Sequence, residues 1–126
     1  MKKVLFIEDD KKFFAIYREA LSLKKIIVLW AGNGKEGMVK VTEEKPDLIV
    51  LDIMLPGGLS GFDVLEQLKV NPMTKRIPVI VLTNLDSEET VAKKIGALDY
   101  KVKANTSLTE IVKLIMERIH APQSVI

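Results

Sequence analysis

The sequence predicts an α/β fold in which helices cover both faces of a five-stranded parallel sheet. Short, unbroken apolar runs alternate along the chain with segments whose apolar residues recur at helical spacing. No low-complexity stretch, solenoid-type repeat or linker interrupts the alternation. Unbroken apolar runs are typical of strands buried on both faces, as in a parallel sheet. Right-handed crossovers between such strands place helices on both sides of the sheet.

Five segments are predicted to be strands, the last of them from a weaker pattern. They cover residues 4–7, 26–29, 48–51, 79–82 and 99–102. The first four are continuous apolar runs bounded by charged or turn-forming residues, which favours buried strands over surface strands.

Helices are predicted between and after these strands from apolar residues that share one face. The faces comprise Phe13, Tyr17, Ala20 and Leu21, then Val64, Leu65 and Leu68, then Leu108, Ile111, Val112 and Ile115. A further helix is expected over residues 86–95, because acidic residues suit the first turn of a helix. Thr106 or Ser107 can cap the last helix, and Glu110 can complete a capping box on Ser107.

The composition excludes several kinds of chemistry. The chain has no cysteine, which rules out disulfides, thiolate metal sites and cysteine nucleophiles. The single histidine, His120, is expected in the C-terminal tail, which argues against histidine metal clusters and Ser-His-Asp catalysis. The net charge of +2 does not mark a nucleic-acid-binding protein. Any chemistry must therefore use carboxylates, hydroxyls, lysines and the backbone.

The length of 126 residues suits one domain, with a core large enough to need no disulfide or structural metal. We expect this domain over residues 1–120 and a short, loose tail over residues 121–126. The N-terminal apolar run is too short for a signal peptide or a membrane span, so we expect a cytoplasmic protein without a membrane contact.

Polar residues with complementary chemistry follow four of the predicted strands. They are Glu8, Asp9 and Asp10 after the first, Asp52 after the third, Thr83 and Asn84 after the fourth, and Lys103 after the fifth. In an open parallel sheet, sites form outside the carboxyl ends of the strands. We therefore expect carboxylates, a hydroxyl and a lysine to meet at one edge.

This set of groups suits phosphoryl transfer. Neighbouring carboxylates repel one another, and a hard cation such as Mg²⁺, which prefers oxygen ligands, relieves the repulsion. A carboxylate beside such an ion can attack phosphorus and form an acyl phosphate. The metal, a lysine ammonium and a hydroxyl would then balance the charge of the phosphoryl oxygens.

Each of these residues has an ordinary explanation when it is taken alone. An acidic run such as residues 8–10 is usually a solvated turn or a helix cap. Asp52 could simply end a strand, Thr83 could be a β-branched strand residue, and Lys103 would be a surface charge by default. The functional interpretation depends on coincidence, because four strand ends supply complementary groups and the sequence contains no competing cluster.

The sequence resembles the receiver domain of response regulators, the CheY-like domain of two-component signalling, over residues 3 to about 119. Residues 4–10 are similar to the first strand and acidic pair of that family, and residues 46–57 to its phosphoacceptor strand and loop. The matches continue at residues 61–65, 78–83 and 96–103, which resemble the third helix and the last two strands. The resemblance implies a flavodoxin-like strand order of 2-1-3-4-5.

The resemblance also implies roles for the acidic residues. Asp52 would accept a phosphoryl group from a sensor histidine kinase or a phosphotransfer protein. Glu8 and Asp9 would hold Mg²⁺, directly or through water, together with Asp52 and the backbone carbonyl of Met54. Asp10 falls where the family begins its loop and is left out of the metal site.

Three further residues take roles by the same resemblance. Thr83 would hydrogen-bond the phosphoryl group, Lys103 would pair with it, and Tyr100 would be the aromatic residue that changes rotamer on activation. The output would be a changed surface formed by the fourth helix, the fifth strand and the last helix, which would bind a downstream protein.

The sequence departs from the family pattern at three places. Ala104 follows Lys103 where the family usually has a proline with a cis peptide bond. A cis bond before a non-proline residue is costly, so we expect a trans or strained loop. The loop at residues 57–61 is one residue longer than usual, and the segment 83–103 is about two residues shorter.

Two other functions were weighed against a phosphorylated receiver. A degenerate receiver would bind a protein without accepting phosphate, but Asp52, Thr83 and Lys103 are all present. A phosphohydrolase of the haloacid-dehalogenase type would resemble Asp-x-Asp at the nucleophile, whereas Met54 stands at the second position. We therefore predict a signalling domain, not an enzyme, whose only chemistry is its own phosphorylation and dephosphorylation.

Overall fold

The computed structural model describes residues 1–121 of the chain. The strands are β1 (Lys3–Ile7), β2 (Ile27–Ala31), β3 (Leu48–Leu51), β4 (Val79–Thr83) and β5 (Asp99–Val102). The helices are α1 (Lys11–Leu21), α2 (Gly34–Glu44), α3 (Gly61–Val70), α4 (Glu89–Ile95) and α5 (Leu108–His120). A 3-10 turn, η1 (Lys103–Asn105), joins β5 to the segment before α5. Strands and helices alternate as the apolar pattern predicts.

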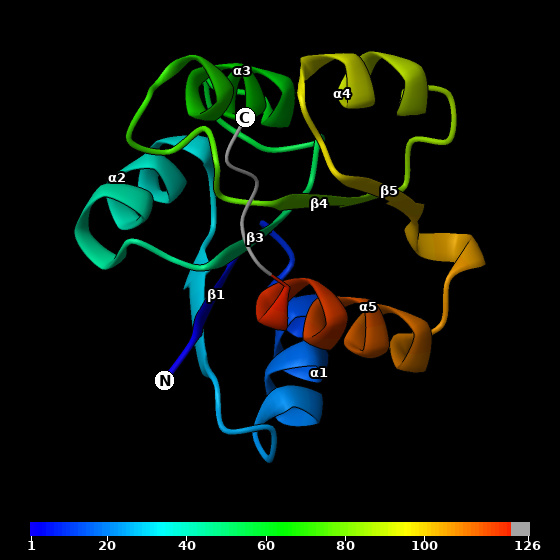
Figure 1. Ribbon diagram of the computed structural model, residues 1–126. Coiled ribbons are helices and arrows are strands. Elements are labelled where there is room, and N and C mark those ends of the chain that lie inside the picture. Colours follow the sequence, from blue (N-terminus) through cyan, green and yellow to red (C-terminus); the bar gives the residue numbers. More distant parts are fainter. Residues whose placement is uncertain (122–126) are drawn as a thin grey trace.

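The five strands form one parallel sheet in the order β2-β1-β3-β4-β5, which confirms the predicted fold class. From β1 the chain passes to β2 at one edge and then returns to β3 on the other side of β1 (Figure 1). The reversal lies between β1 and β3. Ligand sites in open α/β sheets form at such a reversal, beyond the carboxyl ends of the strands.

Helices cover both faces of the sheet, with α1 and α5 on one side and α2, α3 and α4 on the other (Figure 1). Successive strand residues point to opposite faces, so each strand contributes to two cores. In β1, Val4 and Phe6 pack against α1 and α5, while Leu5 and Ile7 pack toward the other three helices. All four side chains are buried, which explains why the strand is an unbroken apolar run.

The second strand was predicted over residues 26–29, but β2 covers Ile27–Ala31. Pairing with β1 sets its bounds, because Lys3 lies opposite Ile27 and the register continues to Ile7 opposite Ala31. Ile26 is buried without belonging to the strand. The apolar run identified the strand, whereas the partner strand decided where it ends.

Helix α2 had no residues assigned to it from the sequence, because its apolar pattern is sparse. Its two glycines, Gly34 and Gly37, also weaken helix propensity. The structure gives a reason for the second glycine, since a Cβ at Gly37 would lie 2.7 Å from the Cδ1 of Ile7. The residue permits a close approach of α2 to β1.

Two helix boundaries differ from the predictions. The helix expected over residues 86–95 begins at Glu89, and its N-terminus has no side-chain cap. His120, expected in the tail, is the last residue of α5, while residues 122–126 of the expected tail lie outside the described part of the chain. The predicted capping box between Ser107 and Glu110 at the start of α5 is confirmed.

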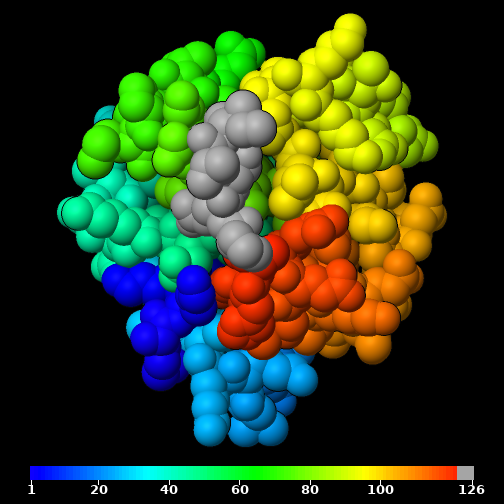
Figure 2. All heavy atoms as spheres, in the orientation of Figure 1, coloured from blue at the N-terminus to red at the C-terminus, as the bar shows by residue number. Residues whose placement is uncertain are grey.

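Helices α1 and α5 pack side by side on one face of the molecule (Figure 2). Arg118 of α5 also reaches β5, where its guanidinium donates two hydrogen bonds to the carboxylate of Asp99, at 2.8 and 2.9 Å.

Within residues 1–121, none of the helices has the length and apolar character needed to cross a membrane.

Candidate functional site

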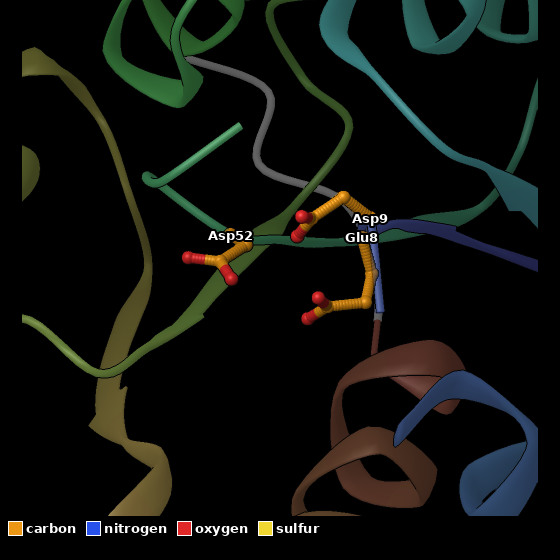
Figure 3. Close-up of side chains that lie close together, drawn as sticks. All are labelled: Glu8, Asp9 and Asp52. Atoms are coloured by element: carbon orange, nitrogen blue, oxygen red, sulfur yellow. The ribbon is translucent and has the colours of Figure 1, made fainter. Parts of the chain in front are cut away.

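Three carboxylates gather at the carboxyl ends of the two strands that flank the reversal in strand order (Figure 3). Glu8 and Asp9 follow β1, and Asp52 follows β3. One oxygen atom from each of the three lies within 4.8 Å of the others. Glu8 and Asp52 are buried, whereas Asp9 is exposed. These three side chains thus meet at one edge of the sheet, as the sequence predicts.

Lys103 supplies the positive charge of the cluster. Its Nζ lies 2.7 Å from Oε1 of Glu8 and 2.9 Å from Oδ2 of Asp52. Burial alone would lower the pKa of Lys103, but hydrogen bonds and charge attraction from both carboxylates outweigh it and raise the pKa. The lysine therefore stays protonated and bridges the acids delivered by β1 and β3.

Burial acts in the opposite direction on Glu8, because it disfavours the carboxylate and raises the pKa of that residue. The hydrogen bond from Lys103 lowers the pKa but offsets burial only in part. The other carboxylate oxygen of Glu8, Oε2, accepts a hydrogen bond from the backbone N–H of Asp10 at 3.0 Å. The backbone carbonyl of Glu8 accepts one from the indole of Trp30 at 2.7 Å. These contacts fix Glu8 at both ends.

Asp52 is held by its own loop. Its Oδ1 accepts a hydrogen bond from the backbone N–H of Met54 at 3.0 Å, so both carboxylate oxygens have a donor when Lys103 is included. The backbone behind it is tightly packed, because a Cβ at Gly61 would lie 2.2 Å from the carbonyl oxygen of Asp52. The N–H of Gly61 also donates to the carbonyl of Ile53 at 2.9 Å. The first residue of α3 therefore supports the loop that carries Asp52.

Thr83 and Tyr100 occupy the next two strands. Thr83 is the last residue of β4, fully buried, and its hydroxyl oxygen accepts a 3.4 Å hydrogen bond from the N–H of Leu85. Tyr100 of β5 is also buried, and its hydroxyl donates to the carbonyl of Leu85. The two predicted switch residues thus contact the same residue of the loop between β4 and α4.

The turn that follows β5 places Lys103. No cis peptide bond occurs within residues 1–121, so the bond before Ala104 is trans, one of the two outcomes expected there. Lys103, Ala104 and Asn105 form η1, and the hydroxyl of Thr106 donates to the carbonyl of Val102 at 2.9 Å.

The donor set at this edge fits a hard divalent cation. The three converging ligand groups, Glu8, Asp9 and Asp52, offer only carboxylate oxygens, the ligands that Mg²⁺ prefers. Asp9 is the exposed member of the group, so a cation would have access from solvent. The side chain of Met54 is exposed as well.

Sequence reasoning missed three contributions to this site. Asp10 was set aside as a loop residue, but it caps α1 by accepting hydrogen bonds from the N–H groups of Lys12 and Phe13. The hydrogen bond from the indole of Trp30 to Glu8 had no signal in the sequence. Phe13 was predicted only as part of an apolar helix face, yet its ring centroid lies 4.2 Å from the Nζ of Lys103.

Known proteins share both the sequence pattern and the fold. The family model of the response regulator receiver domain matches residues 4–116. The alkaline phosphatase synthesis transcriptional regulatory protein PhoP of Bacillus subtilis is 35% identical over 129 residues, which cover 98% of this chain and 52% of PhoP. Protein PilH of Pseudomonas aeruginosa is 36% identical over 107 residues, which cover 82% of this chain and 86% of PilH.

A solved structure agrees with these sequence relatives. The phosphorylated cyanobacterial phytochrome response regulator RcpA superposes with a TM-score of 0.84 at 31% identity, covering 97% of both chains. The chain spans about half the length of PhoP but most of PilH and RcpA. The family match, the strand order and the acidic cluster agree, and the chain belongs to the response regulator receiver domain family, the signalling domains of two-component systems.

Proposed function

We propose that Asp52 accepts a phosphoryl group from a sensor histidine kinase or a phosphotransfer protein, and that its phosphorylation changes a protein-binding surface. The observation that carries the proposal is the position of Asp52, whose Oδ2 lies 2.9 Å from the Nζ of Lys103 beside two further carboxylates. Asp52 also follows β3, the strand that pairs with β4, and Thr83 is the last residue of β4.

The protein forms one covalent bond in the transfer. The Asp52 carboxylate gives an electron pair to phosphorus and forms the new P–O bond, while the bond between phosphorus and the donor breaks. The leaving imidazole of a phosphohistidine departs with that electron pair and takes up a proton. Catalysis then consists of positioning and of charge stabilisation. Lys103 pairs with the phosphoryl oxygens, and the Thr83 hydroxyl hydrogen-bonds one of them.

Glu8, Asp9, Asp52 and the backbone carbonyl of Met54 would hold Mg²⁺ in this proposal. When bound, Mg²⁺ supplies positive charge that offsets the carboxylates and the incoming phosphoryl oxygens. The part played by the protein is to present the carboxylate oxygens together, with Glu8 and Asp52 fixed by Lys103 and by backbone donors.

The signal would leave the site through Thr83 and Tyr100. A phosphoryl group that draws the Thr83 hydroxyl toward it changes the packing beside β4, where Tyr100 contacts Leu85. We propose that the Tyr100 ring changes its arrangement with the loop between β4 and α4. Segments α4, β5 and α5 form a continuous part of the surface (Figure 2) and would bind the downstream protein. Phosphorylation shifts this equilibrium only by its differential stabilisation of the two arrangements.

The wider setting follows from the same proposal. The receiver would occupy residues 1–120 and work in the cytoplasm, with a protein as its target and no direct contact with nucleic acid. A degenerate receiver that binds its partner without phosphate remains the second candidate. The complete set of Asp52, Thr83 and Lys103, with the ion pair already in place, supports the phosphorylated form.

Incubation with a small phosphodonor such as acetyl phosphate and Mg²⁺, followed by intact mass measurement, tests the proposal. We expect the mass of one phosphoryl group on the wild-type chain and none on Asp52→Ala. The matched control is Asp47→Ala, which should be phosphorylated like wild type. The Asp47 carboxylate accepts a hydrogen bond from the backbone N–H of Lys3. An unmodified but folded wild-type chain would favour the degenerate receiver, and an adduct on Asp52→Ala would exclude Asp52 as the acceptor.

A further inference from the structure

Lys103 makes a third contact besides its two carboxylates. Its Nζ lies 4.2 Å from the centroid of the Phe13 ring, within the distance at which a cation is attracted by an aromatic face. Two other cations lie over rings in residues 1–121, Lys11 over Trp30 at 5.5 Å and Arg18 over Phe14 at 5.9 Å. Both of those are exposed, whereas the Lys103 side chain is 12% exposed. Cation–π attraction is stronger when the cation is desolvated, and of these three cations the one over Phe13 is the least exposed and the nearest to its ring.

The position of the Phe13 ring is fixed by the same segment that carries the acids. Asp10 accepts a hydrogen bond from the N–H of Phe13 at 3.1 Å and donates its own N–H to Glu8 at 3.0 Å. The ring packs on Tyr17 one turn later in α1, with centroids 5.1 Å apart. The segment from Glu8 to Phe13 therefore curves around the ammonium of Lys103, with a carboxylate at one end and an aromatic face at the other.

An aromatic ring has a consequence here that a third polar partner would not have. An ammonium has three N–H donors, and Glu8 and Asp52 take two of them. A further carboxylate or hydroxyl would compete with a phosphoryl oxygen for the third. A ring attracts the cation through its electron-rich face but offers no oxygen lone pair that would compete with the phosphoryl group for that donor.

We propose that Phe13 is a positioning residue for phosphoryl transfer, which holds the Lys103 ammonium against Asp52 and keeps one N–H available for the incoming group. The inference rests on the proposed role of Asp52 as the phosphoacceptor. In this proposal Phe13 acts on the reaction through Lys103, whose Nζ lies over its ring.

The first test is the environment of Lys103, which needs no phosphorylation. In the NMR spectrum of the full chain, the ε-CH₂ protons of Lys103 should be shifted upfield by the Phe13 ring current. We expect this shift to disappear in Phe13→Leu and to persist in Phe13→Tyr, which keeps the ring. Phe14→Leu is the control, because Phe14 lies in the same aromatic cluster and stacks on Trp30. Loss of the Phe14 ring should leave the Lys103 signals unchanged. Equal chemical shifts of the Lys103 ε-CH₂ protons in Phe13→Leu and wild type would overturn the proposal.

The second test is the rate of phosphorylation by acetyl phosphate with Mg²⁺, followed by intact mass. We expect the rate to fall roughly three- to tenfold in Phe13→Leu, the range that a partly desolvated cation–π contact supports, and to recover in Phe13→Tyr. Phe14→Leu should react like wild type. Equal rates in Phe13→Leu and wild type, or equal losses in Phe13→Leu and Phe14→Leu, would overturn the positioning role. A wild-type chain that takes no phosphoryl group would instead overturn the proposed function, and the lysine chemical shifts would still decide whether the ring holds Lys103.

Discussion

At the scale of single residues, the site is a balance between like charges and one cation. Glu8 and Asp52 are buried together and share Lys103, while Asp9 remains exposed at their edge. Burying carboxylates is costly unless they are paired and hydrogen-bonded. The chain meets this condition with Lys103 and with the backbone N–H groups of Asp10 and Met54. Asp9 is thus the acid whose charge is least compensated by the protein.

The uncompensated charge of Asp9 predicts that Mg²⁺ stabilises the folded chain. An ion that binds only the folded chain stabilises it by about 1.4 kcal/mol when its concentration is ten times the dissociation constant. We expect Mg²⁺ to raise the free energy of unfolding of the wild type in this way, measured by urea denaturation at constant ionic strength. Asp9→Asn should lose most of the increase, because it removes one of three ligand groups.

The control for that experiment removes one negative charge elsewhere. Glu66 is exposed on α3, so Glu66→Gln changes the net charge equally without changing the acidic cluster. Its response to Mg²⁺ should match the wild type. If Asp9→Asn and wild type gain equally from Mg²⁺, Asp9 is not a ligand.

At the scale of elements, the ends of strands and the starts of helices support one another around Asp52. The loop after β3 and the first turn of α3 approach so closely that residue 61 has no room for a side chain. We expect Gly61→Ala to destabilise the chain by about 1–3 kcal/mol, the usual result of overpacking, as measured by urea denaturation.

Gly58, in the loop before α3, provides the control for this prediction. A Cβ at Gly58 would meet nothing within 4 Å, so Gly58→Ala should change stability by no more than about 0.5 kcal/mol. Equal effects of the two substitutions would contradict the account of the loop, because only the Cβ at residue 61 meets other atoms.

The fluorescence of Trp30, in β2, can report on the site. Trp30 is the only tryptophan, and its indole donates to the carbonyl of Glu8. We expect Mg²⁺ or beryllofluoride to change its fluorescence in the wild type and to have no effect in Asp52→Ala, as followed by titration. A response that survives in Asp52→Ala would show that the indole senses something other than the acceptor site.

At the scale of the whole molecule, the sequence predicts the sheet and its functional edge because both depend on local patterns. Unbroken apolar runs identify buried strands, and parallel strands deliver their ends to one edge, so Asp52 and Lys103 meet although 51 positions separate them. Contacts between elements leave no such pattern. The bounds of β2 depend on its register with β1, and the indole bond to Glu8 depends on packing between neighbouring strands.

Helix positions were harder to predict for a related reason. The glycines of α2 weaken its helical signal yet allow its approach to β1, and α4 begins without a side-chain cap. Phe13 illustrates the same limit at the site, because apolar spacing assigns it to a helix face but does not reveal the lysine above its ring.

The central claim, that Asp52 is the phosphoacceptor, has one direct measurement. The chain is treated with acetyl phosphate and Mg²⁺ and then with borohydride, which reduces an acyl phosphate to the alcohol and so converts a phosphorylated aspartate to homoserine. Peptide mass spectrometry then locates the converted residue. The account predicts homoserine at position 52, at the carboxylate paired with Lys103. Conversion at Glu8, Asp9 or another carboxylate, with Asp52 unchanged, would contradict it.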